Sequence, residues 1–325
     1  MNWLTRSEEV LAGRPLTTDE ALELLRTTDD ELLTVLQAAF QIRRKHFGRG
    51  VRLHVIRNGR SGDCSEDCRY CSQSATANSI ASHPWQSCEE IVAGARDAAQ
   101  RKAVRYCVVA SGRSPSATDI DAVCDVVRAV KAAVNIQVCM SLGLLSPEQA
   151  QRLKAAGLDR YNHNLETSER YFPKTCTTHA YADRLATARA VKAAGLELCC
   201  GGLLGMGETI EDRVALAFSL RDLDADSIPV NLHDPRPGTR FEKLPRLRTA
   251  DALRALAMFR FVNPTKELRI AGGREACLGP LQALALYPAN SIFTNGYLTT
   301  SGQGYTADMA LLHSAGFHVE DWTLA

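Results

Sequence analysis

The stretch YADRLATARAVKAAGLELCCGG, residues 181–202, contains the repeating unit that decides the fold of this chain. Residues 181–195 have the pattern of an amphipathic helix, and Gly195 stands where a helix commonly ends. The next run, LELCCGG at 196–202, is short and apolar, as a buried strand is. A helix that leads directly into an apolar strand is typical of parallel α/β sheets.

The same alternation continues in both directions along the chain. Helical patterns also occupy 88–103, 146–157 and 249–262, and Ser146-Pro147 begins one of them as an N-cap followed by proline. Eight repeats predict an α/β fold closed into a (βα)8 barrel of the TIM type, with an open doubly wound sheet as the alternative. The expected strands lie at 51–56, 104–110, 135–142, 158–166, 196–202, 227–233, 267–273 and 290–295.

Length and composition favour one large domain. The chain has 325 residues, of which 45% are apolar and 23% charged, and this suits a single barrel with a well-buried core. We expect one domain over 1–325, with a short N-terminal helical extension at 1–45 and the barrel core at 46–320. The net charge of +1 without a basic stripe predicts no nucleic-acid partner. The lack of a long apolar run or a signal-like start predicts no membrane association and a cytoplasmic location.

The loop after the first expected strand reads CSEDCRYC and holds Cys64, Cys68 and Cys71 in the spacing C-x3-C-x2-C. In a barrel this loop opens onto the catalytic face. A zinc site completed from elsewhere and a chance cluster are the simpler interpretations, although zinc sites usually show paired C-x2-C units. The more specific interpretation is an iron–sulfur cubane, in which three cysteines hold three irons and leave the fourth iron open to a small molecule.

A second set of cysteines lies within expected strands: Cys107, Cys139 and Cys199. Inward-facing residues of several strands meet in one layer of a barrel, so three thiolates there could hold a second cluster. The alternative is that these are small residues filling the core. Because side chains alternate along a strand, only one of Cys199 and Cys200 faces inward, and the alternation does not say which. The helix-like segments contain three more cysteines that we interpret as structural: Cys88, Cys124 and Cys277.

With Tyr70 before its last cysteine, the C-x3-C-x2-C loop resembles the signature of radical S-adenosylmethionine (SAM) enzymes. The resemblance implies a [4Fe–4S] cluster on Cys64, Cys68 and Cys71, whose open iron binds the amino and carboxylate groups of SAM. Electron transfer to the sulfonium would then release a 5′-deoxyadenosyl radical. Tyr70 would lie near the adenine.

The wider pattern resembles the biotin synthase family of that superfamily, from about residue 50 to about residue 310. Such enzymes convert dethiobiotin to biotin, the last step of its biosynthesis, by radical sulfur insertion at C9 and C6 with sulfur from an auxiliary [2Fe–2S] cluster. The resemblance assigns the ligands of that cluster to Cys107, Cys139, Cys199 and Arg269; relatives often carry Ser at the position of Cys200. Taken by itself, a strand arginine inside a barrel reads as a counter-ion. The matching segments are CSEDCRYC, YNHNLETS (161–168), CCGGLLGMGET (199–209), SIPVNL (227–232), LRIAGGRE (268–275) and ANSIFTNGYLTT (289–300).

The YNHNLE stretch places Asn162, Asn164 and Glu166 on one strand face, and buried polar groups there would be costly unless paired with a polar ligand. Tyr161 and His163 have the other parity and are expected to pack. A polar edge strand is the alternative. The resemblance assigns the SAM contacts to Tyr70, Asn164, Glu166, Arg184, Leu203 and Leu204, with Arg184 on the carboxylate and Asn164 and Glu166 on the ribose. It assigns the ureido ring of dethiobiotin to Asn162, Asn164 and Asn231.

The chain departs from the family pattern after Asn231, where 233–249 adds Asp234, Arg236 and Arg240 near the expected mouth. The resemblance also implies a homodimer, an electron donor such as flavodoxin or ferredoxin, and iron–sulfur assembly machinery. Two other functions compete. One is a related radical enzyme that forms methylornithine or matures a hydrogenase without a sacrificial cluster. The other is a non-catalytic electron-transfer or zinc-binding protein.

Overall fold

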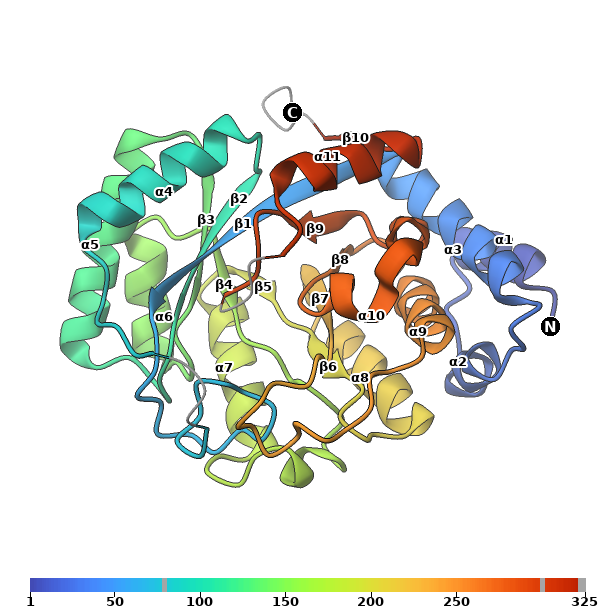
Figure 1. Cartoon of the computed structure of the whole chain (residues 1–325), viewed down its shortest axis with the longest axis horizontal. Coiled ribbons are helices and arrows are strands. Elements are labelled where there is room, and N and C mark those ends of the chain that lie inside the picture. Colours follow the sequence, from blue (N-terminus) through green and yellow to red (C-terminus); the bar gives the residue numbers. More distant parts are fainter. Residues whose placement is uncertain (78–80, 299–301, 321–325) are drawn as a thin grey trace.

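The computed structural model describes residues 1–77, 81–298 and 302–320, and their strands form a ring surrounded by helices (Figure 1). The last two residues of the 289–300 segment, and the outermost part of the expected 1–325 domain, lie outside the described residues. The ring consists of β1 (Gly50–Arg60), β2 (Arg105–Ala110), β3 (Gln137–Ser141), β4 (Arg160–Asn162), β5 (Glu197–Cys199), β6 (Gly202–Leu204), β7 (Ser227–Leu232), β8 (Glu267–Ile270) and β9 (Ser291–Phe293).

All strand pairings in this ring are parallel, in the order β1-β2-β3-β4-β5-β7-β8-β9. The ring closes because β9 also pairs with β1, with Arg52 opposite Ser291. β6 follows β5 after a short break and pairs with β7, so β5 and β6 together fill one of eight positions. The predicted (βα)8 barrel is therefore confirmed, and the open sheet is excluded.

Helices surround the ring as an outer layer (Figure 1), and those that lie at the surface bury one apolar face. In α4, for example, Ile91, Ala95 and Ala98 are buried, which is the spacing of a single helix face. The layer contains α4 (Cys88–Gln100), α5 (Ala117–Ala133), α6 (Pro147–Ala155), η1 (Phe172–Lys174), α7 (Tyr181–Ala193), α8 (Ile210–Asp222), α9 (Thr249–Val262), α10 (Arg274–Leu278), η2 (Gly279–Leu286) and α11 (Tyr305–Ser314). Among the described residues, no helix combines the length and the apolar character needed to cross a bilayer.

Helix ends form where the sequence predicted them. The Ser146 side chain accepts a hydrogen bond from the backbone N–H of Gln149 at 3.1 Å, and Pro147 follows it in the first turn of α6. Gly157 and Gly195 lie just beyond α6 and α7 with φ of 93° and 73°, a conformation that favours glycine.

The N-terminal extension is helical, as expected, and packs beside α9 and α8. Trp3 is buried and meets the ring of Phe261 edge-on at 6.0 Å. The Arg6 guanidinium donates to both carboxylate oxygens of Glu20 at 2.9 Å, which joins the first two helices. The extension comprises α1 (Trp3–Leu11), α2 (Thr18–Leu25) and α3 (Leu32–Phe47).

Two expected strands are interrupted, and both border the barrel lumen. The strand expected over 158–166 has regular pairing only in β4, and Glu166 then adopts φ of 69°. The strand expected over 196–202 breaks into β5 and β6 around Gly201, where an added Cβ would lie 1.9 Å from the carbonyl oxygen of Pro229. The close approach of two backbones therefore bends this part of the wall. One short strand was not predicted: β10 (His318–Val319), which pairs with β1.

Candidate active site

A cavity of about 340 Å³ opens at the carboxyl ends of the barrel strands. Residues that directly follow strands line it, among them Ser111, Gly143, His163 and His233. Active sites of (βα)8 barrels lie at this face. Both predicted sets of cysteines line this one cavity: Cys64, Cys68, Cys71, Cys107, Cys139 and Cys199.

The loop with the first three cysteines is held by the segment 175–179, which precedes α7. The Asp67 carboxylate accepts hydrogen bonds from the backbone N–H and the hydroxyl of Thr177 at 2.8 and 2.5 Å. The backbone N–H of Arg69 donates to the carbonyl of Thr175 at 2.9 Å. These contacts hold the loop across the open end of the barrel, although the loop and its supporting segment lie far apart in the sequence.

The donor set of this loop fits an iron–sulfur cluster. The three thiols form no disulfide, and the backbone N–H of Gln73 donates to the Cys71 sulfur at 3.4 Å, as backbone amides do to cluster sulfurs. A hydrogen bond with Cys176, together with burial, raises the pKa of the Cys68 thiol, and burial raises the pKa of Cys71 to about 11. Metal binding removes these thiol protons, so cluster loading and folding of the loop are linked.

The second set converges because three strands present one residue each to the lumen. Cys107 and Cys139 occupy paired positions on β2 and β3. Cys199 lies on β5, and its sulfur accepts a hydrogen bond from the Asn162 amide at 3.2 Å. Cys200 is fully buried in the apolar core instead, so the structure places Cys199 in the lumen.

Arg269 lies beside this set, within a buried group of charges at the floor of the cavity. Its NH1 group lies 3.8 Å from the Cys199 sulfur. Burial alone would lower its pKa, but Glu267 and the neighbouring thiols raise it. Arg105 and Arg160 are also buried within 3.6 Å of Glu267, while the half-exposed Glu197 contacts the same two arginines.

This floor carries an excess of buried positive charge. Three buried guanidinium groups face Glu267 and the half-exposed Glu197, and the partly exposed Arg52 also lies 3.6 Å from Glu267. The buried Nε atoms of Arg105 and Arg269 have no hydrogen-bond partner in the described part of the chain. Unpaired buried donors are costly, so the floor is suited to an anionic group. Sulfides and thiolates on iron supply such a charge, and the site therefore fits a second cluster.

Five of the six residues assigned to SAM line the cavity: Tyr70, Asn164, Glu166, Arg184 and Leu203. The Arg184 guanidinium donates to the carbonyl of Asn164 at 2.7 Å and lies 3.7 Å from the Glu166 carboxylate, whose pKa is raised by burial. Leu204 is the exception. It is 1% exposed within the apolar core, because alternate residues of β6 face opposite sides, and its assignment to the adenine is corrected.

The three asparagines assigned to the ureido ring also line the cavity. The Asn231 side chain accepts from Gly272 N–H at 2.9 Å and donates to the Gly202 carbonyl at 3.2 Å. A carboxamide has two donors and two acceptor positions, so each of these groups keeps capacity for a ligand. Backbone contacts thus orient Asn231 without using up its hydrogen bonds.

The rest of the wall differs in two ways from the sequence expectation. Tyr161 packs as expected, and its hydroxyl donates to the Gly143 carbonyl at 2.8 Å, but His163 lies on the cavity wall. Of the three charged residues expected near the mouth, Asp234 and Arg236 line the cavity and form an ion pair at 2.6 Å, whereas Arg240 is exposed and is not among the lining residues.

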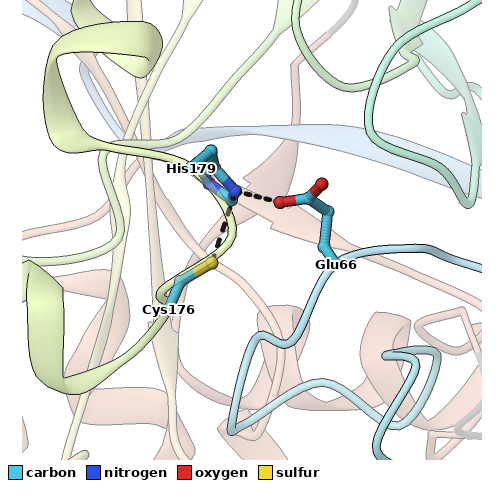
Figure 2. A group of neighbouring side chains, drawn as sticks. All are labelled: Glu66, Cys176 and His179. Carbon is cyan, nitrogen blue, oxygen red and sulfur yellow. Dashed lines mark hydrogen bonds and ion pairs between the residues drawn. The ribbon is translucent and has the colours of Figure 1, made fainter.

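Sequence reasoning missed two groups of residues. One is the charged floor around Glu267, whose members are scattered over several strands. The other is Glu66, Cys176 and His179, whose side chains meet between the cysteine loop and the start of α7 (Figure 2). The spacing C-x2-H at Cys176 and His179 was the available signal for the second group.

Comparisons with known proteins agree with this site. Residues 60–220 match the model of the Radical SAM superfamily, and residues 229–318 match the Biotin and Thiamin Synthesis associated domain. Curated proteins named biotin synthase from Salinibacter ruber and Lysinibacillus sphaericus are each 48% identical over 98% of this chain, covering 90% and 97% of their own lengths.

Solved structures confirm the fold. Methylornithine synthase has a TM-score of 0.85 at 18% identity, with 97% of each chain covered. A maturase of the [FeFe]-hydrogenase, HydG, has the same TM-score and identity, with 99% of this chain and 76% of its own chain covered. At this level of identity the likeness concerns the fold alone.

Proposed function

Because this chain belongs to the biotin synthase family of the radical SAM superfamily, we propose that it converts dethiobiotin to biotin within the barrel cavity. The reaction inserts sulfur at C9 and C6 of the substrate. One observation supports this most strongly: both sets of three cysteines line a single cavity. With SAM bound beside one set and the substrate beside the other, the reacting groups would be held close together.

The cofactors are a [4Fe–4S] cluster, SAM and an additional [2Fe–2S] cluster. When bound, the first cluster supplies the electron that cleaves SAM, and the second supplies sulfur. We assign the first to Cys64, Cys68 and Cys71. We assign the second to Cys107, Cys139, Cys199 and Arg269, with Arg269 also balancing negative charge.

The chain itself binds and orients SAM. In this proposal Arg184 binds the carboxylate with charge-assisted hydrogen bonds. Asn164 and Glu166 accept from the ribose hydroxyls, and the positive φ of Glu166 turns its side chain at the end of the strand. Tyr70 and Leu203 provide apolar surface for the adenine.

The substrate is held by amides. Asn162 and Asn231 would pair with the cyclic urea of dethiobiotin, whose N–H and C=O groups match a carboxamide. Asn164 lies between Asn162 and Glu166 in the sequence and contacts both ligands in the proposal. Asn162 also donates to the Cys199 sulfur, and this contact supports a urea site beside the second set of cysteines.

The remaining assignments concern the domain, its location and its partners. We propose that the chain is one domain, since β6 of the first matched region pairs with β7 of the second within one closed ring. A cytoplasmic location is supported by eleven free cysteines, which suit a reducing compartment. A homodimer, an electron donor such as flavodoxin or ferredoxin, and iron–sulfur assembly proteins follow from the family resemblance.

Iron analysis of the anaerobically reconstituted protein tests the two sites. Wild type should bind about six irons per chain, and Cys139→Ala about four, with loss of one Mössbauer signal only. Cys200→Ser is the matched control, since Cys200 neighbours the lumen but packs in the core, and it should retain both signals. About four irons in wild type, or loss of both signals in Cys139→Ala, would contradict two independent sites.

A further inference from the structure

The side chains of Glu66, Cys176 and His179 form a compact polar group (Figure 2), and His179 in turn contacts Arg184. Glu66 comes from the loop itself, while Cys176 and His179 come from the segment that supports it. Nδ1 of His179 contacts the Glu66 carboxylate and lies 3.3 Å from the Cys176 sulfur. The side chains of Glu66 and His179 are 7% and 5% exposed, so water competes little for these contacts.

The hydrogen bond on the other side of His179 fixes its tautomer. Arg184 Nε lies 3.0 Å from His179 Nε2. A guanidinium only donates, so Nε2 must accept, and the ring proton resides on Nδ1. Nδ1 therefore donates to Glu66, and the three side chains form a directed chain of hydrogen bonds from Arg184 to the cysteine loop.

The same atoms resemble a metal site, because ligand atoms of Glu66, Cys176 and His179 lie within 4.8 Å of one another. A metal on Nδ1 would need the lone pair of that nitrogen and would move the proton to Nε2. The N–H of Nε2 would then face the N–H of Arg184, two donors without an acceptor. The observed contact therefore favours hydrogen bonds from Arg184 through His179 to Glu66 over a metal site. We call these three side chains the relay.

The other contacts of Arg184 show what the relay controls. Its guanidinium lies over the Phe172 ring at 5.3 Å, and the His179 ring packs on the same phenyl group. The carbonyl of Asn164 and Nε2 of His179 accept two of the five N–H donors, so the others are available to a ligand in the cavity that Arg184 lines. Without the histidine, the Glu166 carboxylate at 3.7 Å competes for this guanidinium.

We propose that His179, anchored by Glu66, is a positioning residue that aims Arg184 at the carboxylate of SAM. The assignment rests on the proposed function, which gives Arg184 that ligand. Because Glu66 lies between Cys64 and Cys68, the relay also joins the cysteine loop to the SAM site. Ordering of the loop by its cluster thus favours the binding-competent orientation of Arg184.

The test measures the dissociation constant of SAM for reconstituted enzyme, together with its iron content. His179→Phe retains the ring packing but removes both nitrogens, and it should weaken SAM binding about tenfold at unchanged iron content. His179→Gln offers an acceptor to Arg184 and a donor to Glu66, and it should restore binding to within about twofold. Tyr181→Phe, whose ring packs on the same Phe172, is the control and should bind SAM as wild type does.

A double-mutant cycle separates positioning from a structural role. In an Arg184→Gln background, His179→Phe should cause no further loss of SAM binding, since the residue through which it acts is gone. With Arg184 intact, His179→Phe should raise KM for SAM, while kcat for 5′-deoxyadenosine release changes little. Independent, additive losses would overturn the proposal, as would failure of the Gln variant to rescue.

Two further outcomes are decisive. A bound metal beyond the cluster irons that disappears in His179→Phe would overturn the relay in favour of a metal site. The relay and the proposed function fail in different ways. An enzyme that makes biotin but shows additive losses refutes the relay alone, whereas one that cleaves SAM without making biotin refutes the substrate assignment alone.

Discussion

At the scale of single residues, Glu267 organises the floor of the cavity. Its carboxylate contacts Arg160, Arg269 and His54 and accepts from the Ser227 hydroxyl at 2.8 Å. Burial alone would raise the pKa of this carboxyl, but the surrounding cations hold it well below its usual value. Glu267 is thus a fixed negative charge that positions Arg269 beside Cys199.

Replacement of Glu267 should therefore impair the second cluster. Glu267→Gln keeps the shape but leaves buried guanidinium groups uncompensated, and we expect a loss of about 3–5 kcal/mol in the free energy of unfolding. Iron content should fall from about six toward four per chain. Glu197→Gln, at the half-exposed rim of the same group, should have a much smaller effect. Full second-cluster signals and unchanged urea unfolding in Glu267→Gln would contradict this role.

Some residues of the site could be predicted from the sequence, and others could not. Cys107, Cys139 and Cys199 could be proposed as a set because strand positions in a barrel converge. The choice of Cys199 over Cys200 came from resemblance, since alternation alone permits either. His179 and Glu267 could not be assigned, because their roles depend on partners more than a hundred positions away in the chain or on other strands.

At the scale of elements, the helices could be predicted more fully than the strands. Caps such as Ser146 act through neighbours three residues away, so the sequence contains the whole interaction. The break between β5 and β6 depends on contact between Gly201 and Pro229, which lie on different parts of the wall. A local pattern therefore extends these strands beyond where their pairing stops.

The contact between α1 and α2 gives a pH-dependent stability. The hydrogen bonds from Arg6 lower the pKa of Glu20 from 4.5 to about 2. A carboxyl with a depressed pKa stabilises the folded state above its unfolded pKa, and this contribution is lost as the pH falls from 4.5 toward 2.

We expect Glu20→Gln to destabilise the chain by about 2 kcal/mol at neutral pH and to reduce the pH dependence between 4.5 and 2. Urea unfolding of the cluster-free chain, followed by circular dichroism at a series of pH values, measures both effects. Glu9→Gln, which alters a more exposed partner of Arg6, should leave the acid dependence intact. An unchanged pH profile in Glu20→Gln would show that this pair does not contribute.

At the scale of the whole molecule, the barrel brings the cysteines of one loop and those of three strands to a single cavity. Alternating strands and helices predicted the barrel, since eight such units close readily. The pairing of β9 with β1 that closes it, and the additional pairing of β10 with β1, were not readable from sequence. The region matched by the Radical SAM superfamily contains the six cysteines of the two sets, while the second matched region supplies Asn231 and Arg269. The cavity needs both regions.

The central claim is that this cavity joins SAM cleavage to sulfur insertion. The most direct measurement is an anaerobic reaction of the reconstituted protein with dethiobiotin, SAM and a reductant, with biotin and 5′-deoxyadenosine quantified together. Wild type should form both products, and Cys139→Ala should form 5′-deoxyadenosine without biotin. Wild-type protein that releases 5′-deoxyadenosine while carrying both clusters, yet never forms biotin, would contradict the claim.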